Sequence, residues 1–200
     1  EPNSDVFFGV TSNDIGEVAV DFGSQQLHFT PLNWNIPQTV LLTGVDETII
    51  DGDQLTQIIV SVDAISDPNF TLEASQNINV INTDNDFAQI IITPIDQLTG
   101  ENGESGSFSI RLSATPFSPV EIRFSSNNIN EGTMTNSSII ISPSDWDQFQ
   151  IITINGVDDL IPMSDGAIDY DIFINSIIST DPYFGNIIPA SIAPVVMTNQ

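Results

Sequence analysis

The sequence predicts an all-β fold made of two tandem β-sandwich domains, and three observations support this prediction. Hydrophobic residues make up 40% of the 200 residues, and isoleucine, valine and phenylalanine are prominent among them. Such β-branched and aromatic side chains pack better on pleated sheets than on helices. Twelve prolines and twelve glycines are spread along the chain and leave almost no window for a long amphipathic helix. The third observation is an internal repeat with a period of about 113 residues.

The repeat predicts the domain organisation. Short motifs recur in the same order in both halves, and the only two tryptophans, Trp34 and Trp146, occupy equivalent positions. The matched motifs are Ile15 and Glu17 with Ile129 and Glu131, Thr30-Pro31-Leu32-Asn33-Trp34 with Ser142-Pro143-Ser144-Asp145-Trp146, Gly44-Val45-Asp46-Glu47 with Gly156-Val157-Asp158-Asp159, Asp51-Gly52 with Asp165-Gly166, and Asp67-Pro68 with Asp181-Pro182. We therefore predict a first domain at residues 1–86 and a second at residues 87–200.

Short strand signals follow one another through the second copy, separated by turn residues such as those of Gly100-Glu101-Asn102-Gly103. The expected strands are 89–93, 107–112, 120–125, 138–142, 150–154, 169–174 and 193–197. About seven strands in a hundred-odd residues are typical of a β-sandwich.

The first copy is shorter at its front. Pro2 aligns with Pro116 and Val6 with Val120, so the first copy has no counterpart of roughly residues 87–114, which include the opening strands of the second copy. Two interpretations stay open. Either the strands were removed at this end of the chain, or the gap is filled by another chain or by sequence beyond the given residues.

The charge balance excludes several classes of partner. The chain has 27 acidic residues against two arginines, Arg111 and Arg123, and its formal net charge is −25. Nucleic acids and anionic membranes are bound mainly through Lys and Arg, so neither is an expected partner. Cysteine and lysine are absent, which excludes disulfides, thiolate sites and Schiff bases. No segment has the roughly 18–20 apolar residues that span a bilayer, so membrane insertion is not expected. Together with the repeats, this composition favours an exported protein.

Catalysis is not expected. The single histidine, His28, lies in a strand pattern and has Ile140 as its counterpart, so no nucleophile and base can be assembled around it. The acidic residues cluster at module ends and do not line an aromatic cleft of the kind that glycoside hydrolysis needs. We therefore predict that the protein is not an enzyme.

The carboxylates fall at strand ends, in matched positions of the two copies. The clusters are Asp46-Glu47, Asp51-Gly52-Asp53 and Asn82-Thr83-Asp84-Asn85-Asp86 in the first copy, and Asp158-Asp159, Asp165-Gly166 and the tail Thr198-Asn199 in the second. In a sandwich these loops share one pole. Like charges so close raise one another's pKa unless a cation lies between them, and calcium fits such a flexible oxygen cluster better than magnesium. The alternative is solvated turn chemistry, because Asp-Gly and Asn-Asp are common turn residues.

These motifs resemble the tandem Calx-β-type repeats of large bacterial surface proteins. The resemblance is sharpest from Phe29 to Asp46, continues through Asp51-Gly52-Asp53 to Asp84-Asn85-Asp86, and is looser in the second copy. It implies an immunoglobulin-like sandwich that binds Ca²⁺ at one pole. The ligands that it implies are Asp46, Glu47, Asp51, Asp53, Asp84 and Asp86 in the first copy, and Glu101, Asp158, Asp159 and Asp165 in the second. The second site is expected to be weaker, because Ala167 stands in the place of Asp53 and Asn199-Gln200 in the place of the terminal acidic triplet.

The leading functional hypothesis is a non-enzymatic structural repeat of a bacterial cell-surface or extracellular protein. Calcium would stiffen it as a rod or spacer in adhesion, with neighbouring repeats of the same protein as partners. Two alternatives remain. One is an adhesin module that binds cell-surface glycans through calcium, with Tyr183 and Phe184 as candidate contacts. The other is the protomer of an extracellular filament or sheath, assembled with other copies by strand donation.

Overall fold

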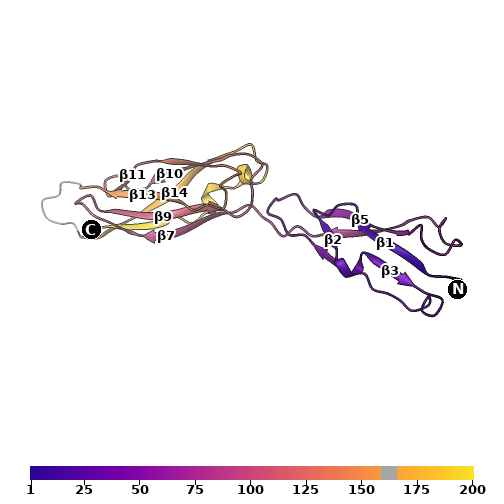
Figure 1. Ribbon diagram of the computed structural model, residues 1–200. Coiled ribbons are helices and arrows are strands. Elements are labelled where there is room, and N and C mark those ends of the chain that lie inside the picture. The colour runs from indigo at the N-terminus through magenta and orange to yellow at the C-terminus, as the bar shows by residue number, and fades with distance from the viewer. Residues whose placement is uncertain (159–165) are drawn as a thin grey trace. The chain divides into compact units, whose positions relative to one another are not determined.

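A computed structural model describes residues 1–158 and 166–200, and they form two compact units (Figure 1). Unit 1 contains Glu1–Glu47 and Asp51–Asn85, and unit 2 contains Thr48–Ile50 and Asp86–Gln200. The described residues form strands and three short 3-10 helices, with no α-helix among them. The all-β fold class is therefore confirmed, and the sheets are those of β-sandwiches.

Unit 2 is a complete two-sheet sandwich. One sheet has the order β12-β10-β14-β15-β8 and the other β11-β13-β9-β7, and every pairing is antiparallel except that of β15 with β8. The strands are β7 (Ile90–Asp96), β8 (Leu98–Thr99), β9 (Ser105–Leu112), β10 (Val120–Ser126), β11 (Gly132–Met134), β12 (Ser138–Ile141), β13 (Gln150–Gly156), β14 (Ile168–Ile178) and β15 (Val195–Asn199).

The core of unit 2 follows from the alternation of its strands. On β9, Phe108, Ile110 and Leu112 have at most 1% of their surface exposed. Successive side chains of a strand point to opposite faces, so these three residues enter the core together. Phe108 meets Phe124 of β10 edge to face, with ring centroids 5.7 Å apart. Burying each such side chain contributes about 1.5–3 kcal/mol, and this burial holds the two sheets together.

Unit 1 contains six strands, which correspond through the repeat to β10–β15 of unit 2. Its larger sheet has the order β3-β1-β5-β6, and its second sheet contains only β2 and β4. The strands are β1 (Val6–Ser12), β2 (Val18–Val20), β3 (Gln26–Phe29), β4 (Leu42–Gly44), β5 (Gln54–Val62) and β6 (Gln76–Asn82). Among its described residues, nothing corresponds to β7, β8 or β9. Its core is accordingly small, with Val10, Val18, Val20 and Ile58 as its buried members.

Thr48–Ile50 belongs to unit 2, although it lies between β4 and β5 in the sequence. The backbone N–H of Thr115 donates to the carbonyl of Thr48 at 2.7 Å, and Ile49 forms a parallel bridge with Thr115. Ile50 packs in the hydrophobic core of unit 2.

The repeated Asp-Pro motif has a structural role in both units. Asp67 is buried, and its carboxylate accepts hydrogen bonds from the backbone N–H groups of Asn69 at 2.9 Å, Ser4 at 2.9 Å and Asn3 at 2.6 Å. Asp181 does the same for Phe117 at 2.6 Å. The N–H donors from Asn69 and then Ser4 lower the pKa of Asp67. Each aspartate thus ties the segment before its unit's β1 or β10 strand to the loop after β5 or β14.

Candidate metal centre

Three carboxylates meet at one end of unit 1. Glu17 lies just before β2, Glu47 follows β4, and Asp51 precedes β5. One oxygen atom of each lies within 4.8 Å of the others. Two loops far apart in the sequence, the one before β2 and the one between β4 and β5, therefore place three oxygen donors around one point, with Glu17 half-buried and Asp51 exposed.

The turn Asp51-Gly52-Asp53 links this cluster to the end of β6. Gly52 has a φ of +79°, in the left-handed region that favours glycine. Its N–H donates to Asp84 Oδ2 at 2.8 Å, and the N–H of Asp84 donates to Asp53 Oδ1 at 3.1 Å. These two bonds hold the carboxylates of Asp53 and Asp84 at the turn that also carries Asp51.

An asparagine positions the glutamate. Asn82 Nδ2 donates to Glu17 Oε2 at 3.1 Å and to the carbonyl of Val45 at 3.0 Å. The N–H of Val45 in turn donates to the carbonyl of Glu17 at 2.8 Å. The Glu17 side chain is therefore held against the strand end that leads to Asp46 and Glu47.

Unit 2 contains the same arrangement. Asn199 Nδ2 donates to Glu131 Oε2 at 3.1 Å and to the carbonyl of Val157 at 3.0 Å. The shared bonds make Asn199 the counterpart of Asn82. The expectation that Asn199-Gln200 replaces the acidic triplet was therefore wrong: these residues correspond to Asn82-Thr83, one position short of Asp84.

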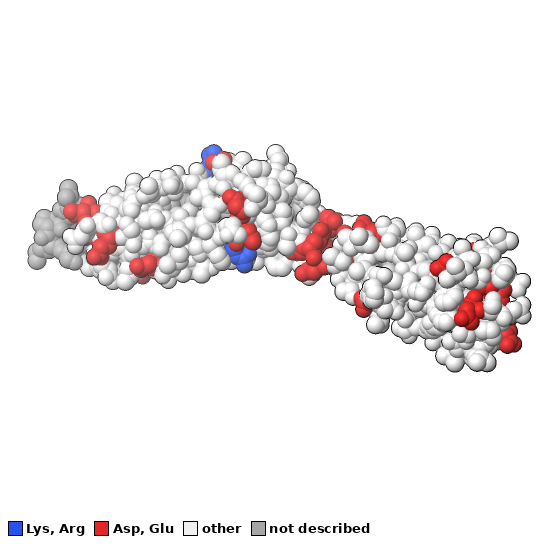
Figure 2. Space-filling view, in the orientation of Figure 1, with Lys and Arg blue, Asp and Glu red and all other residues white. Residues whose placement is uncertain are grey.

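No Lys or Arg lies near the carboxylate cluster of unit 1 along the sequence. No Lys or Arg precedes Arg111, and Arg123 pairs with Glu121 at 2.7 Å in unit 2. In Figure 2 the Asp and Glu side chains gather in patches, and the basic atoms in view belong to unit 2. Two carboxylates about 5 Å apart repel by about 1 kcal/mol in water and several-fold more once desolvated. A bound cation would remove this repulsion.

The structure brings together only part of the predicted ligand set. Glu47 and Asp51 lie in the three-carboxylate cluster, and Asp53 and Asp84 lie at its adjoining turn. Asp46 Oδ1 accepts from Asn85 Nδ2 at 3.2 Å. Asp86 falls in unit 2.

Glu17 was not predicted as a ligand. The sequence did contain a signal for it, because Glu17 and Glu131 are matched acidic residues of the two copies. Their place before a short strand gave no reason to expect them beside loops that lie some 30 residues further along the chain.

The predicted ligands of unit 2 are only partly described. Asp159 and Asp165 lie outside the described residues. Glu101 lies in the turn after β8, and Asp158 follows β13. A Cβ on Gly156 would collide with the Gly100 carbonyl oxygen, so these two segments lie in contact and place Glu101 and Asp158 at the same pole.

The glutamate of unit 2 is more deeply buried than that of unit 1. Glu131 is 6% exposed, and no group of three close carboxylates includes it among the described residues. A buried chain of hydrogen bonds continues from Asn199 through Thr99 to Tyr170, whose hydroxyl lies 2.9 Å from Thr99 Oγ1. Burial raises the pKa of Tyr170. In unit 2, Glu131 is therefore part of a buried hydrogen-bond network that stabilises the fold.

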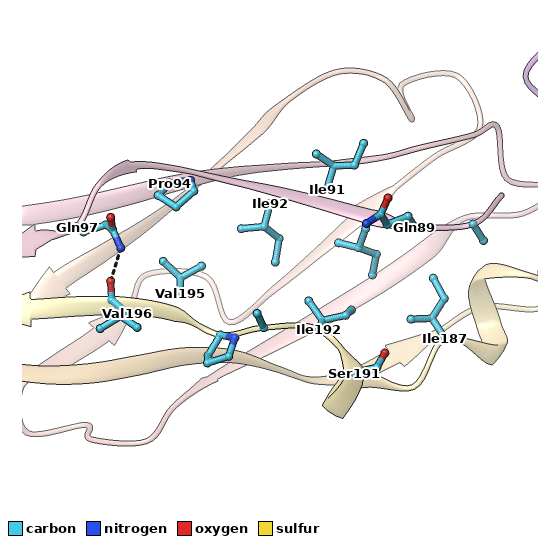
Figure 3. A pocket seen from close by; sticks show the side chains of 14 residues that line it. Gln89, Ile91, Ile92, Pro94, Gln97, Ile187, Ser191, Ile192, Val195 and Val196 are labelled. Atoms are coloured by element: carbon cyan, nitrogen blue, oxygen red, sulfur yellow. Dashed lines mark hydrogen bonds between the residues drawn. The ribbon is translucent and has the colours of Figure 1, made fainter. Parts of the chain in front are cut away.

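Two other features of the surface are the single histidine of unit 1 and a groove in unit 2. His28 stacks on Phe7, with ring centroids 4.4 Å apart, and its Nε2 lies 2.9 Å from Asp5 Oδ2 at the surface of unit 1. A groove of about 780 Å³ in unit 2 runs between β7 and the segment before β15 (Figure 3). Gln97 Nε2 donates to the Val196 carbonyl at one end of it, at 2.7 Å. The residues lining the groove are apolar or uncharged.

Comparison with known proteins assigns no family. No protein-family model matches the chain, and a search of curated proteins finds no match. Among solved structures, the crystal structure of CBD12 from CALX1.2 is similar, with a TM-score of 0.39 and 10% identity over 89% of this chain and 71% of that chain. A likeness this low assigns neither a family nor a ligand, so the proposals below rest on the residues themselves. No helix in the described part of the chain has the length and hydropathy to span a membrane.

Proposed function

We propose that this chain is a non-enzymatic calcium-binding structural repeat of a bacterial cell-surface or extracellular protein. The observation that supports the calcium site is the convergence of Glu17, Glu47 and Asp51 within 4.8 Å. The motif resemblance to Calx-β-type repeats described above agrees with it.

The donor set favours Ca²⁺ over other metals. It consists of carboxylate oxygens, with no cysteine in the chain and with His28 engaged with Asp5. Hard cations prefer oxygen ligands, and Ca²⁺ accepts six to eight of them in flexible geometry, including backbone carbonyls and waters. Asp53 and Asp84 at the adjoining turn offer further oxygens. An exposed site of this kind belongs to the weaker class of about 10⁻⁴–10⁻³ M, which suits extracellular calcium.

Calcium would act mechanically. The ion would join the loop before β2 to the loop between β4 and β5, and thereby reduce the freedom of both. A repeat stiffened in this way would serve as a rod or spacer in adhesion, with neighbouring repeats of the same protein as its partners. The excess of carboxylates would also keep a long exported protein soluble.

Calorimetric titration and thermal melts of the full chain test the proposal. Saturating Ca²⁺ should raise the melting temperature relative to EDTA, since a ligand at a hundredfold excess over its Kd contributes about 2.7 kcal/mol. Glu47→Gln and Asp51→Asn should abolish the increase. Glu73→Gln, an exposed carboxylate outside the cluster, is the matched control and should retain it. Coincident melting curves in calcium and EDTA would refute the metal site.

The glycan-binding alternative loses support from the structure. Of its two candidate aromatic residues, Phe184 is fully buried and Tyr183 is 40% exposed. Both follow the end of β14, whereas Asp158 and Glu101 lie at the pole where β14 begins and meets the end of β15. Neither aromatic residue therefore flanks the acidic pole of unit 2.

A further inference from the structure

The dipeptide Asn-Gly occurs twice in the sequence, as Asn102-Gly103 and Asn155-Gly156, and both copies lie in unit 2. Asparagine is a chemically labile residue, and a following glycine makes it most reactive, because glycine has no side chain to shield its own backbone nitrogen. The two sites share this chemistry, so the structure around each of them determines whether it reacts.

The reaction is deamidation within the chain. The backbone nitrogen of the glycine attacks the side-chain carbonyl carbon of the asparagine, and its proton leaves with the side-chain nitrogen as ammonia, which gives a cyclic succinimide. Water then opens the ring at one of its two carbonyl groups and produces aspartate or isoaspartate. The first step requires a glycine N–H released from its hydrogen bond and an asparagine side chain that can turn toward it.

Asn155-Gly156 is held by hydrogen bonds at the end of β13. Asn155 Nδ2 donates to Thr135 Oγ1 at 2.9 Å, and Asn155 Oδ1 accepts from Ser105 Oγ at 3.0 Å. The N–H of Gly156 donates to the carbonyl of Glu104 at 3.1 Å. Both reacting groups are therefore fixed as long as β13 stays paired with its neighbouring strands.

Asn102-Gly103 lies in the turn between β8 and β9, where both residues are exposed. Gly103 has a φ of +86°, and nothing lies within 4 Å of the position that a Cβ on it would occupy. Its N–H donates to the carbonyl of Gly100 at 2.9 Å. This single bond of an exposed turn opens far more often than a paired strand, since opening free energies range from near zero in loops to the global value in core strands.

We propose that Asn102 is a deamidation site of the folded protein and that Asn155 is protected. The inference rests on the different surroundings of the same dipeptide within one unit. It depends neither on calcium nor on the function proposed above.

The product changes the acidic pole of unit 2. Deamidation adds a carboxylate next to Glu101, at the pole where Asp158 also lies. Isoaspartate also inserts the former side-chain methylene into the main chain of the turn. This turn positions Glu104, whose carbonyl accepts from the N–H groups of Gly100 at 3.2 Å and Gly156 at 3.1 Å. The isoaspartate form should therefore loosen the contact between the turn and β13.

The test is incubation of the folded full chain at mildly alkaline pH, followed by peptide mapping with mass spectrometry. The mass increase of replacing NH₂ by OH should accumulate at Asn102 about tenfold or more faster than at Asn155, because the strand must open before the second site reacts. Methyl transfer by an isoaspartyl methyltransferase then measures the isoaspartate fraction at Asn102.

Two controls separate the effect of the fold from that of the local sequence. In a chain kept unfolded in urea, Asn102 and Asn155 should react at similar rates. Asn102→Gln should remove the reaction at this position, because the longer side chain does not close the same ring. Asn102→Asp carries the new charge on an ordinary backbone and thereby separates the effect of charge from that of isoaspartate.

Thermal melts test the consequence. The incubated chain should melt at a lower temperature than the fresh chain, whereas incubated Asn102→Gln and fresh Asn102→Asp should melt close to the fresh chain. Equal melts before and after formation of isoaspartate would overturn the predicted loosening of the turn. Equal rates at the two sites of the folded chain, faster reaction at Asn155, or no product at Asn102 under conditions in which the unfolded chain reacts would overturn the proposal itself.

Discussion

Truncating the asparagine of each unit, Asn82→Ala and Asn199→Ala, should destabilise the two units to different extents. Each side-chain amide donates both to a glutamate and to a strand-end carbonyl. A hydrogen bond to a charged group contributes about 1.5–3 kcal/mol and a neutral one about 0.5–1.5 kcal/mol. The burial of each asparagine determines how much of this hydrogen-bond free energy is lost on substitution.

In unit 1 the pair is half-buried, and water can replace part of the lost bonding. We therefore expect Asn82→Ala to lower the free energy of unfolding by about 1–2 kcal/mol. In unit 2, Asn199 is 2% exposed and Glu131 is 6% exposed. Asn199→Ala leaves a buried carboxylate without its amide and removes the acceptor of Thr99, so its cost should be about 3 kcal/mol or more.

Urea unfolding of the full chain measures both effects. Trp34 reports on unit 1 and Trp146 on unit 2 through tryptophan emission, with a Trp→Phe variant of each to separate the signals. Asn82→Ala should also weaken calcium binding about tenfold, since it releases Glu17 from its position. The reasoning fails if Asn199→Ala costs the same as, or less than, Asn82→Ala.

Two further predictions concern acid stability and close packing. Because backbone donors lower the pKa of Asp67 in the folded state, its contribution to stability is present above the unfolded pKa of about 4 and is lost as pH falls through the lower folded value. The urea concentration at the unfolding midpoint of unit 1 should decrease as the pH is lowered below about 4. Asp67→Asn should lower this midpoint at neutral pH and make it less dependent on pH in the acid range. An unchanged pH dependence in the variant would contradict the role assigned to Asp67. Gly156→Ala should destabilise unit 2 by about 1–3 kcal/mol, because the new Cβ collides with the Gly100 backbone. Gly23→Ala, with nothing within 4 Å of its Cβ, is the control, and equal thermal melts for the two variants would be inconsistent with this contact.

Much of the architecture could be read from local patterns. Alternation of apolar and polar residues over 107–112 predicted a strand, and β9 (Ser105–Leu112) contains these residues. The repeated tryptophan and Asp-Pro motifs predicted that both halves share one fold. These features are local, because strand periodicity and turn chemistry depend on residues that are neighbours in the chain.

The candidate site could be predicted less completely from local sequence patterns. Glu17 and Asn82 are 65 residues apart, and their hydrogen bond depends on how the two sheets pack. Phe184 looked like a surface contact beside Tyr183, yet the 3-10 turn Phe184–Asn186 places it in the core. Alternation cannot assign a face to residues in such a turn, because the twofold period holds only within strands.

The sequence alone therefore indicated seven of the nine strands described in unit 2, the repeat and the clustering of carboxylates at strand ends, because each is encoded in residue type and short spacing; β8 and β11 were not predicted. Tertiary packing determined that Glu17 joins Glu47 and Asp51, that matched asparagines hold the two glutamates, and that Thr48–Ile50 belongs to unit 2. Among the described residues, β4 pairs with β2 alone, whereas β13 pairs with both β11 and β9. These features depend on contacts between distant segments, and such contacts form only when the sheets pack against each other.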